Sequence, residues 1–501
     1  MSARRPPSDH VDVLIVGAGL SGIGCAHHLQ ARQPGKTYAI LEARGALGGT
    51  WDLFRYPGIR SDSDLQTLGY VFKPWTGEKA IADGPAILEY VRATAAENGI
   101  DRHIRLHHRV VRAEWSTAEA CWTVHAERTD TGEGVRLTAA WLFSAGGYYR
   151  YDEGYTPRFE GRERFGGPIV HPQQWPEDLD YAGKRVVVIG SGATAVTLVP
   201  AMTDRAAHVT MLQRSPSYVI SIPSTDAIAN ALRRLLGDRR GYDLTRRKNI
   251  WLQAKVYSLS RSRPGLVKRV IRAGVRHRLP EGYAVDTHFR PRYDPWDQRL
   301  CVVPDGDLFK AISAGDASIV TDAVETFTER GLKLASGAEL EADIVITATG
   351  LNLLAFGGVQ LVVDGREIAL PDTLAYKSMM LSGVPNFAYA VGYTNASWTL
   401  KVDLVCAYLC RLIAYLDAQG QDYCVPEVGD TELERRPLLD LSAGYVQRSV
   451  DDFPRQGSVA PWQLNMSYAA DAAGFRDGAV EDGSLRVGRR ALATHADALV
   501  A

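Results

Sequence analysis

Several features that define other protein classes are scarce in this 501-residue chain. Its six cysteines are too sparse for the disulfide framework of a small secreted protein. No cysteine–histidine cluster accompanies them, so we predict no metal site. The formal net charge is only −1, which gives the whole molecule no bias toward nucleic acid or another polyanion. Disulfide-rich, zinc-binding and strongly basic protein classes are therefore disfavoured.

Long apolar runs are missing as well. The first ten residues are polar and lack the apolar stretch of a secretory signal, so we expect a cytoplasmic protein. No run reaches the roughly 20 residues that a membrane-spanning helix needs. The longest candidate, residues 402–416, contains Asp403 and Arg411 and is better interpreted as a buried or half-buried helix. The chain is long enough for two or three domains, each with its own core.

A glycine-rich turn near the N-terminus is the first positive signal. Residues 11–16 have the length and β-branching of a buried parallel strand, and a predicted helix to about residue 32 follows the turn. A second strand, residues 37–41, ends at Glu42, twenty positions after the last glycine, where an acid would accept hydrogen bonds from a ribose. The glycines of the motif are Gly17, Gly19 and Gly22. This βαβ unit predicts a dinucleotide site.

A second glycine-rich turn has the same organisation. It follows a predicted strand over residues 185–189, and its candidate nucleotide contacts are Gly190, Gly192, Thr194 and Ala195. The next strand, residues 208–212, is followed by Arg214 and Ser215 rather than by an acid. A guanidinium pairs with a 2′-phosphate that a carboxylate would repel, so NADPH is favoured over NADH. Two such turns predict two bound nucleotides.

The order of these patterns predicts an α/β fold with two Rossmann-like dinucleotide-binding domains and a helical insertion. We expect the first domain to be discontinuous, interrupted by the second. Later apolar strands end in small residues, and proteins with two dinucleotide domains cross from one domain to the other at such points. The predicted segments are 1–150 and 351–501 for the first domain, 151–225 and 298–350 for the second, and 226–297 for the insertion. We expect the tail after about residue 478 to be loosely ordered.

The predicted insertion has an unusual charge. Residues 233–278 contain fifteen lysines and arginines against two acids, Asp238 and Asp243. One interpretation is a surface that meets anionic lipid or another polyanion. The other is a solvated helical insertion within the second nucleotide domain. Balanced overall charge and the lack of interleaved aromatics favour the second interpretation and argue against nucleic acid, while a weak association with the inner face of the membrane stays open.

Residues 165–176, between the two turns, fit the pattern F-x-G-x-x-x-H-x-x-x-W-P at every fixed position. The fixed residues include Phe165, Gly167, His171 and Trp175. This pattern resembles the fingerprint of Baeyer–Villiger monooxygenases, flavoenzymes that insert one atom of O2 beside a carbonyl. His171 titrates near neutrality and could act as an acid or base. The resemblance implies another role, in which the segment links the domains, and His171 and Trp175 govern domain rotation and NADPH placement.

The same resemblance assigns FAD to the first site. Gly49, Thr50 and Trp51 belong to an E-x-x-x-x-x-G-G-x-W element similar to that of flavin monooxygenases, and Val110 is a further expected FAD contact. The resemblance also implies that residues 395–399 begin a helix whose positive end approaches the flavin.

A catalytic pair follows from the resemblance. Residues 55–62 match the segment R-Y-P-G-x-R-x-D, whose Asp62 would lie beside the flavin and pair with a catalytic arginine that corresponds to Arg299. An arginine stays protonated at any relevant pH and would stabilise negative oxygen as an oxyanion hole does. Several family members carry a lysine next to this arginine that also reaches the 2′-phosphate. Gln298 stands there in this chain, so we expect a less strict preference for NADPH.

The function implied is an FAD- and NADPH-dependent Baeyer–Villiger monooxygenase that converts ketones to esters or lactones with O2 through a C4a-peroxyflavin. Oxygenation of sulfur in thioethers or thioamides is also implied. One alternative is a flavin monooxygenase that acts mainly on soft sulfur or nitrogen, which needs a protonated hydroperoxide and is disfavoured by Arg299 with Asp62. Another is a non-catalytic, redox-sensing flavoprotein. A disulfide reductase is disfavoured because the Cys-x4-Cys pair is absent. The ketone and the oligomeric state are not predicted.

Overall fold

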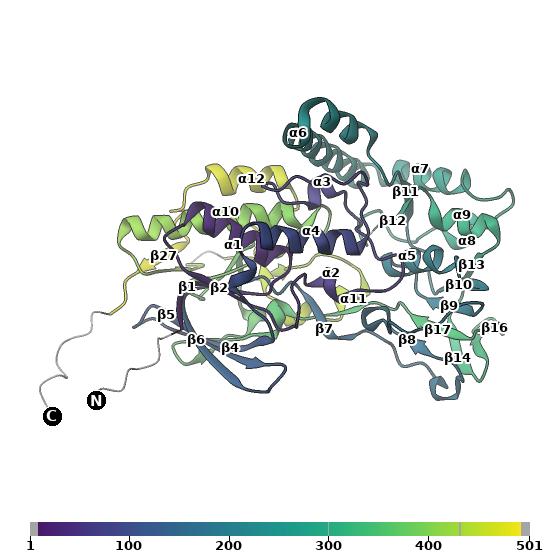
Figure 1. Cartoon of the computed structure of the whole chain (residues 1–501), viewed down its shortest axis with the longest axis horizontal. Helices are drawn as coiled ribbons and strands as arrows, with labels where there is room; N and C mark the ends of the chain where they lie inside the picture. The colour runs from purple at the N-terminus through teal and green to yellow at the C-terminus, as the bar shows by residue number, and fades with distance from the viewer. Residues whose placement is uncertain (1–8, 299, 430–431, 492–501) are drawn as a thin grey trace, which may run out of the picture.

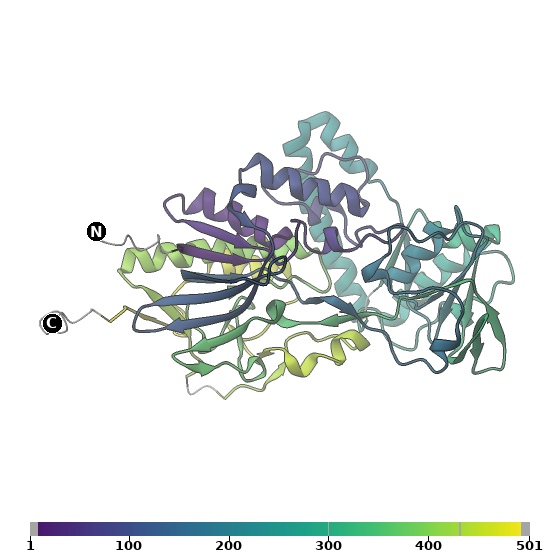
Figure 2. The same cartoon turned by 60° about the horizontal axis from the view of Figure 1, so that its bottom comes forward.

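Two sheets dominate the computed structural model, which describes residues 9–298, 300–429 and 432–491. Figures 1 and 2 show them in two halves of an elongated molecule, with helix α6 (Ala227–Ser262) projecting at the periphery. Within those residue ranges no helix has the length and apolar character that crossing a membrane requires. The α/β fold class is confirmed.

The first sheet has nine strands and grows from the predicted N-terminal βαβ unit. Strand β1 (His10–Val16) pairs in parallel with β2 (Tyr38–Leu41) and β6 (Gly134–Ser144). Helices α1 (Leu20–Arg32) and α10 (Trp398–Gln419) pack together against this sheet. The order across the sheet is β20 (Arg366–Glu367), β19 (Gln360–Val363), β4 (His108–Ser116), β5 (Cys121–Arg128), β6, β1, β2 and β3 (Ile104–Arg105), and β23 (Phe387–Tyr389) also pairs with β6.

The second sheet has five parallel strands and contains the second predicted βαβ unit. Helix α5 (Ala193–Met202) follows its central strand, and α9 (Asp307–Ala314) packs against α5. The strand order is β13 (Ala317–Thr321), β10 (His208–Gln213), β9 (Arg185–Ile189), β17 (Ile344–Thr347) and β8 (Ile169–Val170), and a separate antiparallel meander comprises β14 (Val324–Thr328), β15 (Gly331–Leu334) and β16 (Glu339–Glu341). The exact domain boundaries stay predictions.

Helices fill the predicted insertion, between β11 (Val219–Ile222) and its partner β12 (Cys301–Pro304). They are α6, which bends at Gly237, α7 (Pro264–Arg276) and α8 (Val285–His288). One side of α6 packs on the first half of the molecule, where its Arg246 is buried and donates hydrogen bonds to backbone carbonyls of residues 66–69. The helices are therefore confirmed, but the expectation that they are solvated is wrong for this inner side, because Arg246 is buried there.

Shorter elements complete the chain. They are α2 (Thr50–Leu53), α3 (Leu65–Leu68), α4 (Gly84–Glu97), β7 (Tyr149–Gly154), β18 (Leu351–Leu353), β21 (Ala375–Tyr376), β22 (Met380–Leu381), β24 (Tyr423–Pro426), β25 (Arg436–Pro437), α11 (Gly444–Gln447), β26 (Arg455–Gln456), α12 (Tyr468–Asp477) and β27 (Leu485–Gly488). Strand β27 corrects the expectation of a loosely ordered tail, because it pairs with β24 and thereby satisfies its backbone groups. A strand of four residues is too short to be recognised from a periodic pattern in the sequence.

Gly22 provides a test of the first turn. A Cβ atom at this position would lie 1.9 Å from the carbonyl oxygen of Gly17, so Gly22→Ala should lower the free energy of unfolding by about 3 kcal/mol in urea titrations. Gly192→Ala is the matched control, because a Cβ atom there meets no atom within 4 Å. Equal stability of Gly22→Ala and the parent would contradict this packing.

Candidate functional site

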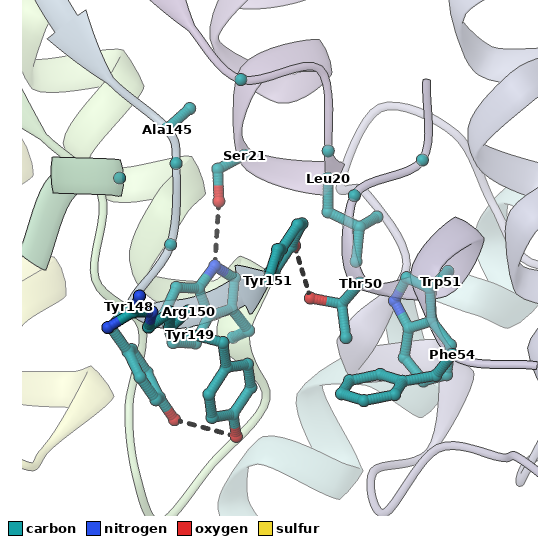
Figure 3. A pocket seen from close by; sticks show the side chains of 18 of the residues that line it. Leu20, Ser21, Thr50, Trp51, Phe54, Ala145, Tyr148, Tyr149, Arg150 and Tyr151 are labelled. Carbon is teal, nitrogen blue, oxygen red and sulfur yellow. Dashed lines mark hydrogen bonds between the residues drawn. The ribbon is translucent and has the colours of Figure 1, made fainter. Parts of the chain in front are cut away.

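A cavity of about 800 Å³ lies where several strands of the first sheet end. Its lining includes Val16, Leu41 and Ala145, at or just beyond the carboxyl ends of β1, β2 and β6. Open α/β sheets bind ligands at this edge, and the volume is that of a typical cofactor site. Figure 3 shows the side chains that converge on it. Nine predicted site residues line it, namely Gly17, Gly19, Glu42, Gly49, Thr50, Trp51, Asp62, Val110 and Thr194.

The first glycine turn shapes one wall of the cavity through close backbone contacts. Gly17 has φ +104°, which an L side chain rarely adopts, and Gly22 packs against Gly17 without lining the cavity. A Cβ atom on Gly49 would lie 3.1 Å from the Cα atom of Gly19, so these two glycines face each other. No side chain caps the first turn of α1, which begins here. Such a backbone cradle fits a pyrophosphate.

Glu42 is buried at the end of β2 and lines the same cavity. Its carboxylate accepts hydrogen bonds from the backbone N–H groups of Ala18 (2.8 Å) and Arg44 (3.0 Å). Burial raises the pKa of Glu42, and these two hydrogen bonds act in the opposite direction. The carboxylate is thus held beside the glycine turn.

A buried carboxylate positions the turn that contains Thr50 and Trp51. Asp52 is 2% exposed and forms ion pairs with Arg44 at 2.6 Å, Arg92 at 3.0 Å and Arg55 at 3.3 Å. Thr50 Oγ1 forms a 3.0 Å hydrogen bond with the hydroxyl of Tyr151, as Figure 3 shows. The sequence does not indicate this cluster, because the spacings of Arg44 and Arg55 from Asp52 match no known pattern and Arg92 lies on a different helix, α4.

The start of α10 forms another part of the lining. Trp398, its first residue, donates a 2.9 Å hydrogen bond from Nε1 to Ser21 Oγ on α1 (Figure 3). The preceding Ser397 lies 2.6 Å from Thr67, Oγ to Oγ1, and Ala396 lines the cavity. The positive end of the helix therefore points toward the cavity, as expected for residues 395–399.

Tyr56, which the sequence analysis missed, links the predicted catalytic region to the second glycine turn. It lines the cavity together with Asp62 and Thr194. Burial raises the pKa of Tyr56, the charge of Asp62 raises it further, and a hydrogen bond with Thr194 lowers it. Asp62 and Thr194 thus both lie close to one phenol. Tyr56 is the tyrosine of the R-Y-P-G-x-R-x-D segment, but that pattern does not indicate its contact with Thr194, which lies far away in the chain and which only the fold brings close.

Apart from Thr194 and the adjacent Ala193, the second turn lies outside this cavity. Gly190 has φ +147°, and a Cβ atom on it would lie 2.3 Å from the carbonyl oxygen of Ala348. Gly192 has open space around it, and Ala195 is buried. Arg214 and Ser215 are exposed directly after β10, at the carboxyl edge of the second sheet. Their placement fits a second nucleotide on this edge.

The fingerprint residues lie away from the cavity lining. Phe165 packs with Phe327 in the core beneath the meander, and Gly167 has no room for a side chain because a Cβ atom would lie 2.2 Å from the carbonyl oxygen of Asp343. Trp175 is half-buried against the core of the second sheet. None of the three is positioned for direct chemistry in the cavity.

His171 forms a hydrogen bond between the fingerprint segment and the loop that follows β17. Its Nε2–H donates to the carbonyl oxygen of Gly350 (3.0 Å), and its Nδ1 accepts from the backbone N–H of Gln173 (3.2 Å). The imidazole is neutral in this arrangement, because a proton on Nδ1 would abolish the second bond. Its environment therefore fits a linker residue.

Arg299, the predicted catalytic arginine, lies outside the described residues. Its described neighbours, Gln298 and Leu300, do not line the cavity. A second cavity, about 600 Å³, lies between α7 and residues 289–292. Its cationic lining comprises Lys268, Arg269, Arg272, Arg290 and Arg292. Gln213 at the end of β10 donates to the carbonyl of His288 (2.8 Å), so this basic segment runs beside Arg214.

Comparison with known proteins agrees with this architecture. A family model described as pyridine nucleotide-disulphide oxidoreductase matches residues 14–234. The FAD-containing monooxygenase EthA of Mycobacterium tuberculosis (strain CDC 1551 / Oshkosh) is 57% identical over 484 residues, which cover 96% of this chain and 99% of EthA. The putative FAD-containing monooxygenase MymA of the same strain is 52% identical over 484 residues, 95% of this chain and 97% of MymA.

Among solved structures, an oxidised steroid monooxygenase bound to NADP matches 96% of this chain and 100% of its own, with a TM-score of 0.76 at 22% identity. That likeness and the two sheets define an α/β fold with two Rossmann-like sheets. The identity to EthA over nearly the whole length is more specific. The chain belongs to the family of FAD-containing monooxygenases.

His171 gives a prediction about pH. Burial lowers its pKa below the ordinary 6.5, while hydrogen bonds to backbone carbonyls act in the opposite direction. The unfolded chain therefore binds this proton more readily than the folded chain. The stabilisation is complete above pH 6.5 and is lost as the pH falls through the folded-state pKa.

NMR titration of the His171 ring should give a pKa below 6.5, and His171→Asn should reduce the loss of unfolding free energy on acidification. A pKa at or above 6.5 would show that the neutral, doubly bonded imidazole is wrong.

Proposed function

We propose that this protein is a Baeyer–Villiger monooxygenase that uses FAD and NADPH to convert ketones to esters or lactones. In the balanced reaction, ketone, O2, NADPH and a proton give ester, NADP+ and water. One oxygen atom enters between the carbonyl carbon and the migrating carbon, and the other leaves as water. The observation that carries the proposal is the cavity in which the first glycine turn, Asp62 and Thr194 of the second turn meet.

The described residues fit FAD in this cavity. Gly17, Gly19 and Gly49 would hold the pyrophosphate by backbone contacts, and Glu42 would bind the ribose. The buried hydroxyl of Ser61 lines the cavity without a hydrogen-bond partner among the described residues, as expected of a group that a ligand would satisfy. The cofactor would supply hydride acceptance and O2 activation. The positive end of α10 would stabilise negative charge on its ring system.

NADPH would occupy the carboxyl edge of the second sheet. Gly190, Gly192, Thr194 and Ala195 form the turn there, and Arg214 with Ser215 would hold the 2′-phosphate. We propose that Phe165, Gly167, His171 and Trp175 belong to a hinge between the two nucleotide domains. The contact of His171 with the crossover at Gly350 supports this role.

We propose Arg299 and Asp62 as the catalytic pair. Arg299 would stabilise the negative charge that develops on oxygen during attack on the ketone. Asp62 would orient that guanidinium, and its place in the cavity beside Tyr56 supports this role.

The first test is turnover of the FAD-loaded enzyme with NADPH, heavy-isotope O2 and a panel of phenylacetone and 2-alkanones. Mass spectrometry should find ester that carries one heavy oxygen atom. Oxidised NADPH and peroxide without ester across the panel would overturn the proposal. Heavy oxygen in thioether or thioamide products alone would transfer it to sulfur oxygenation.

Arg299→Ala should separate the two halves of the reaction. NADPH should still reduce the flavin, as followed by loss of flavin absorbance, because hydride transfer does not need this charge. Ester formation should fall about a hundredfold or more, the loss typical for one oxyanion-stabilising donor. Arg263→Ala, which removes an exposed arginine on the insertion, is the matched control. Ester formation by Arg299→Ala at the parent rate would show that Arg299 is the wrong residue.

Arg214→Ala should weaken discrimination between the two nicotinamide cofactors. Loss of one charge-assisted contact to the 2′-phosphate should lower the ratio of kcat/KM for NADPH to kcat/KM for NADH about tenfold or more. Arg205→Ala, an exposed arginine that precedes β10 at the opposite edge of the same sheet, should leave the ratio unchanged. An unchanged ratio in Arg214→Ala would assign the phosphate to other cations, first to Arg290 and Arg292.

A further inference from the structure

The helical insertion exposes apolar side chains that the rest of the protein does not cover. Of twelve exposed large hydrophobic residues in the described ranges, ten lie between positions 228 and 270. The outer face of α6 carries four of them, Leu244, Trp251, Leu252 and Leu259, whereas exposed Val256 continues the line of the inner face. Trp251 is 60% exposed. Figure 1 shows α6 at the edge of the molecule, away from both sheets.

The opposite face of α6 is polar and packs on the protein. Tyr242 and Arg246 donate hydrogen bonds to backbone carbonyls of residues 66–70, and Asn249 and Gln253 donate to the carboxylate of Asp64 at 2.9 and 2.7 Å. These residues follow one another at spacings of four, three and four, which is one helix face. The helix is therefore the reverse of an ordinary surface helix, whose apolar side faces the core.

Cations lie beside the apolar residues on the outer face. Arg240, Arg247 and Lys255 are exposed, and the helical spacing puts them on the same side as Leu244 and Trp251. Among the described residues none of the three has an ion pair, whereas neighbouring Arg239 pairs with Asp243 at 3.0 Å. The outer face thus combines apolar side chains with unpaired positive charge.

This combination limits what can cover the outer face. A second copy docked symmetrically would bring the two cationic faces together, and like charges repel. Nucleic acid would neutralise the cations but would leave Trp251, Leu252 and Leu259 without an apolar partner. An anionic bilayer meets both requirements, because its headgroups attract the cations and its acyl boundary accepts the apolar side chains.

We propose that the outer face of α6 docks the protein on an anionic lipid bilayer. The helix lies in the plane of the membrane, with Trp251, Leu252 and Leu259 entering the boundary between headgroups and acyl chains. Tryptophan is favoured at this depth. Arg240, Arg247 and Lys255 contact lipid phosphates. On α7, exposed Leu266 and Val270 extend the same kind of surface.

Vesicle co-sedimentation of the FAD-loaded, full-length enzyme tests the proposal. The parent should bind vesicles that contain phosphatidylglycerol, bind pure phosphatidylcholine vesicles much more weakly, and bind less as salt is raised. Trp251→Ser/Leu252→Ser/Leu259→Ser should reduce binding more than tenfold. Arg240→Gln/Arg247→Gln/Lys255→Gln should reduce it on the order of a hundredfold. Val459→Ser is the matched control, because Val459 is an exposed apolar residue outside the insertion.

Bound flavin absorbance reports folding for every variant, so a lost contact can be separated from a lost structure. Absence of binding to anionic vesicles at low salt would overturn the proposal. Full binding by the serine variant would also overturn it, because simple charge adsorption would then suffice. A dimer in sedimentation velocity that the serine variant abolishes would assign the outer face to a second copy. None of these readouts depends on ester formation, so failure here leaves the proposed reaction standing.

Discussion

Close backbone contact at the first glycine turn is the constraint on which the cavity depends. Gly17 and Gly22 touch where even a methyl group cannot fit, and Gly19 faces Gly49 across the cavity wall. These contacts bring three strand ends, the turn at Gly49 and the start of α10 to one point. Side chains such as Glu42 and Asp52 then hold the surrounding segments by hydrogen bonds and ion pairs. Backbone contacts between glycines thus determine the shape of the cavity, and the buried carboxylates stabilise the segments around it.

Polar and apolar contacts join the two halves of the molecule. Arg60 forms a 2.5 Å ion pair with Asp307 at the start of α9, and β7 pairs with β18 where the chain crosses between the sheets. His171 is hydrogen-bonded to the residue just before β18. Phe54 and Tyr56 of the first half pack into the core of the second sheet, so the boundary also buries apolar side chains.

The inner face of α6 connects the insertion to the same cavity. Asp64 accepts hydrogen bonds from Asn249 and Gln253, and it also bonds to Thr67, whose hydroxyl contacts Ser397 at the start of α10. A continuous set of hydrogen bonds therefore runs from the proposed lipid-docking helix to the edge of the cavity. Buried networks of this kind favour one arrangement of their members, because a partly broken network leaves unsatisfied polar groups. A short series of hydrogen bonds from its inner face therefore connects α6 to the edge of the cavity.

The sequence by itself determined both βαβ units, the strand and helix order around them, and nine of the residues that line the cavity. It could do so because a tight turn against a helix start demands glycine at fixed spacings, and such demands are local. The tertiary structure decided the three arginines around Asp52, the place of Tyr56 beside Asp62 and Thr194, and the pairing of β27 with β24. It also decided which side of α6 faces outward, against the ordinary rule that apolar residues lie inside. Most of these features depend on contacts between distant segments, such as Arg92 with Asp52, Thr194 with Tyr56 and β27 with β24, and contacts at such separations leave no spacing pattern in the sequence.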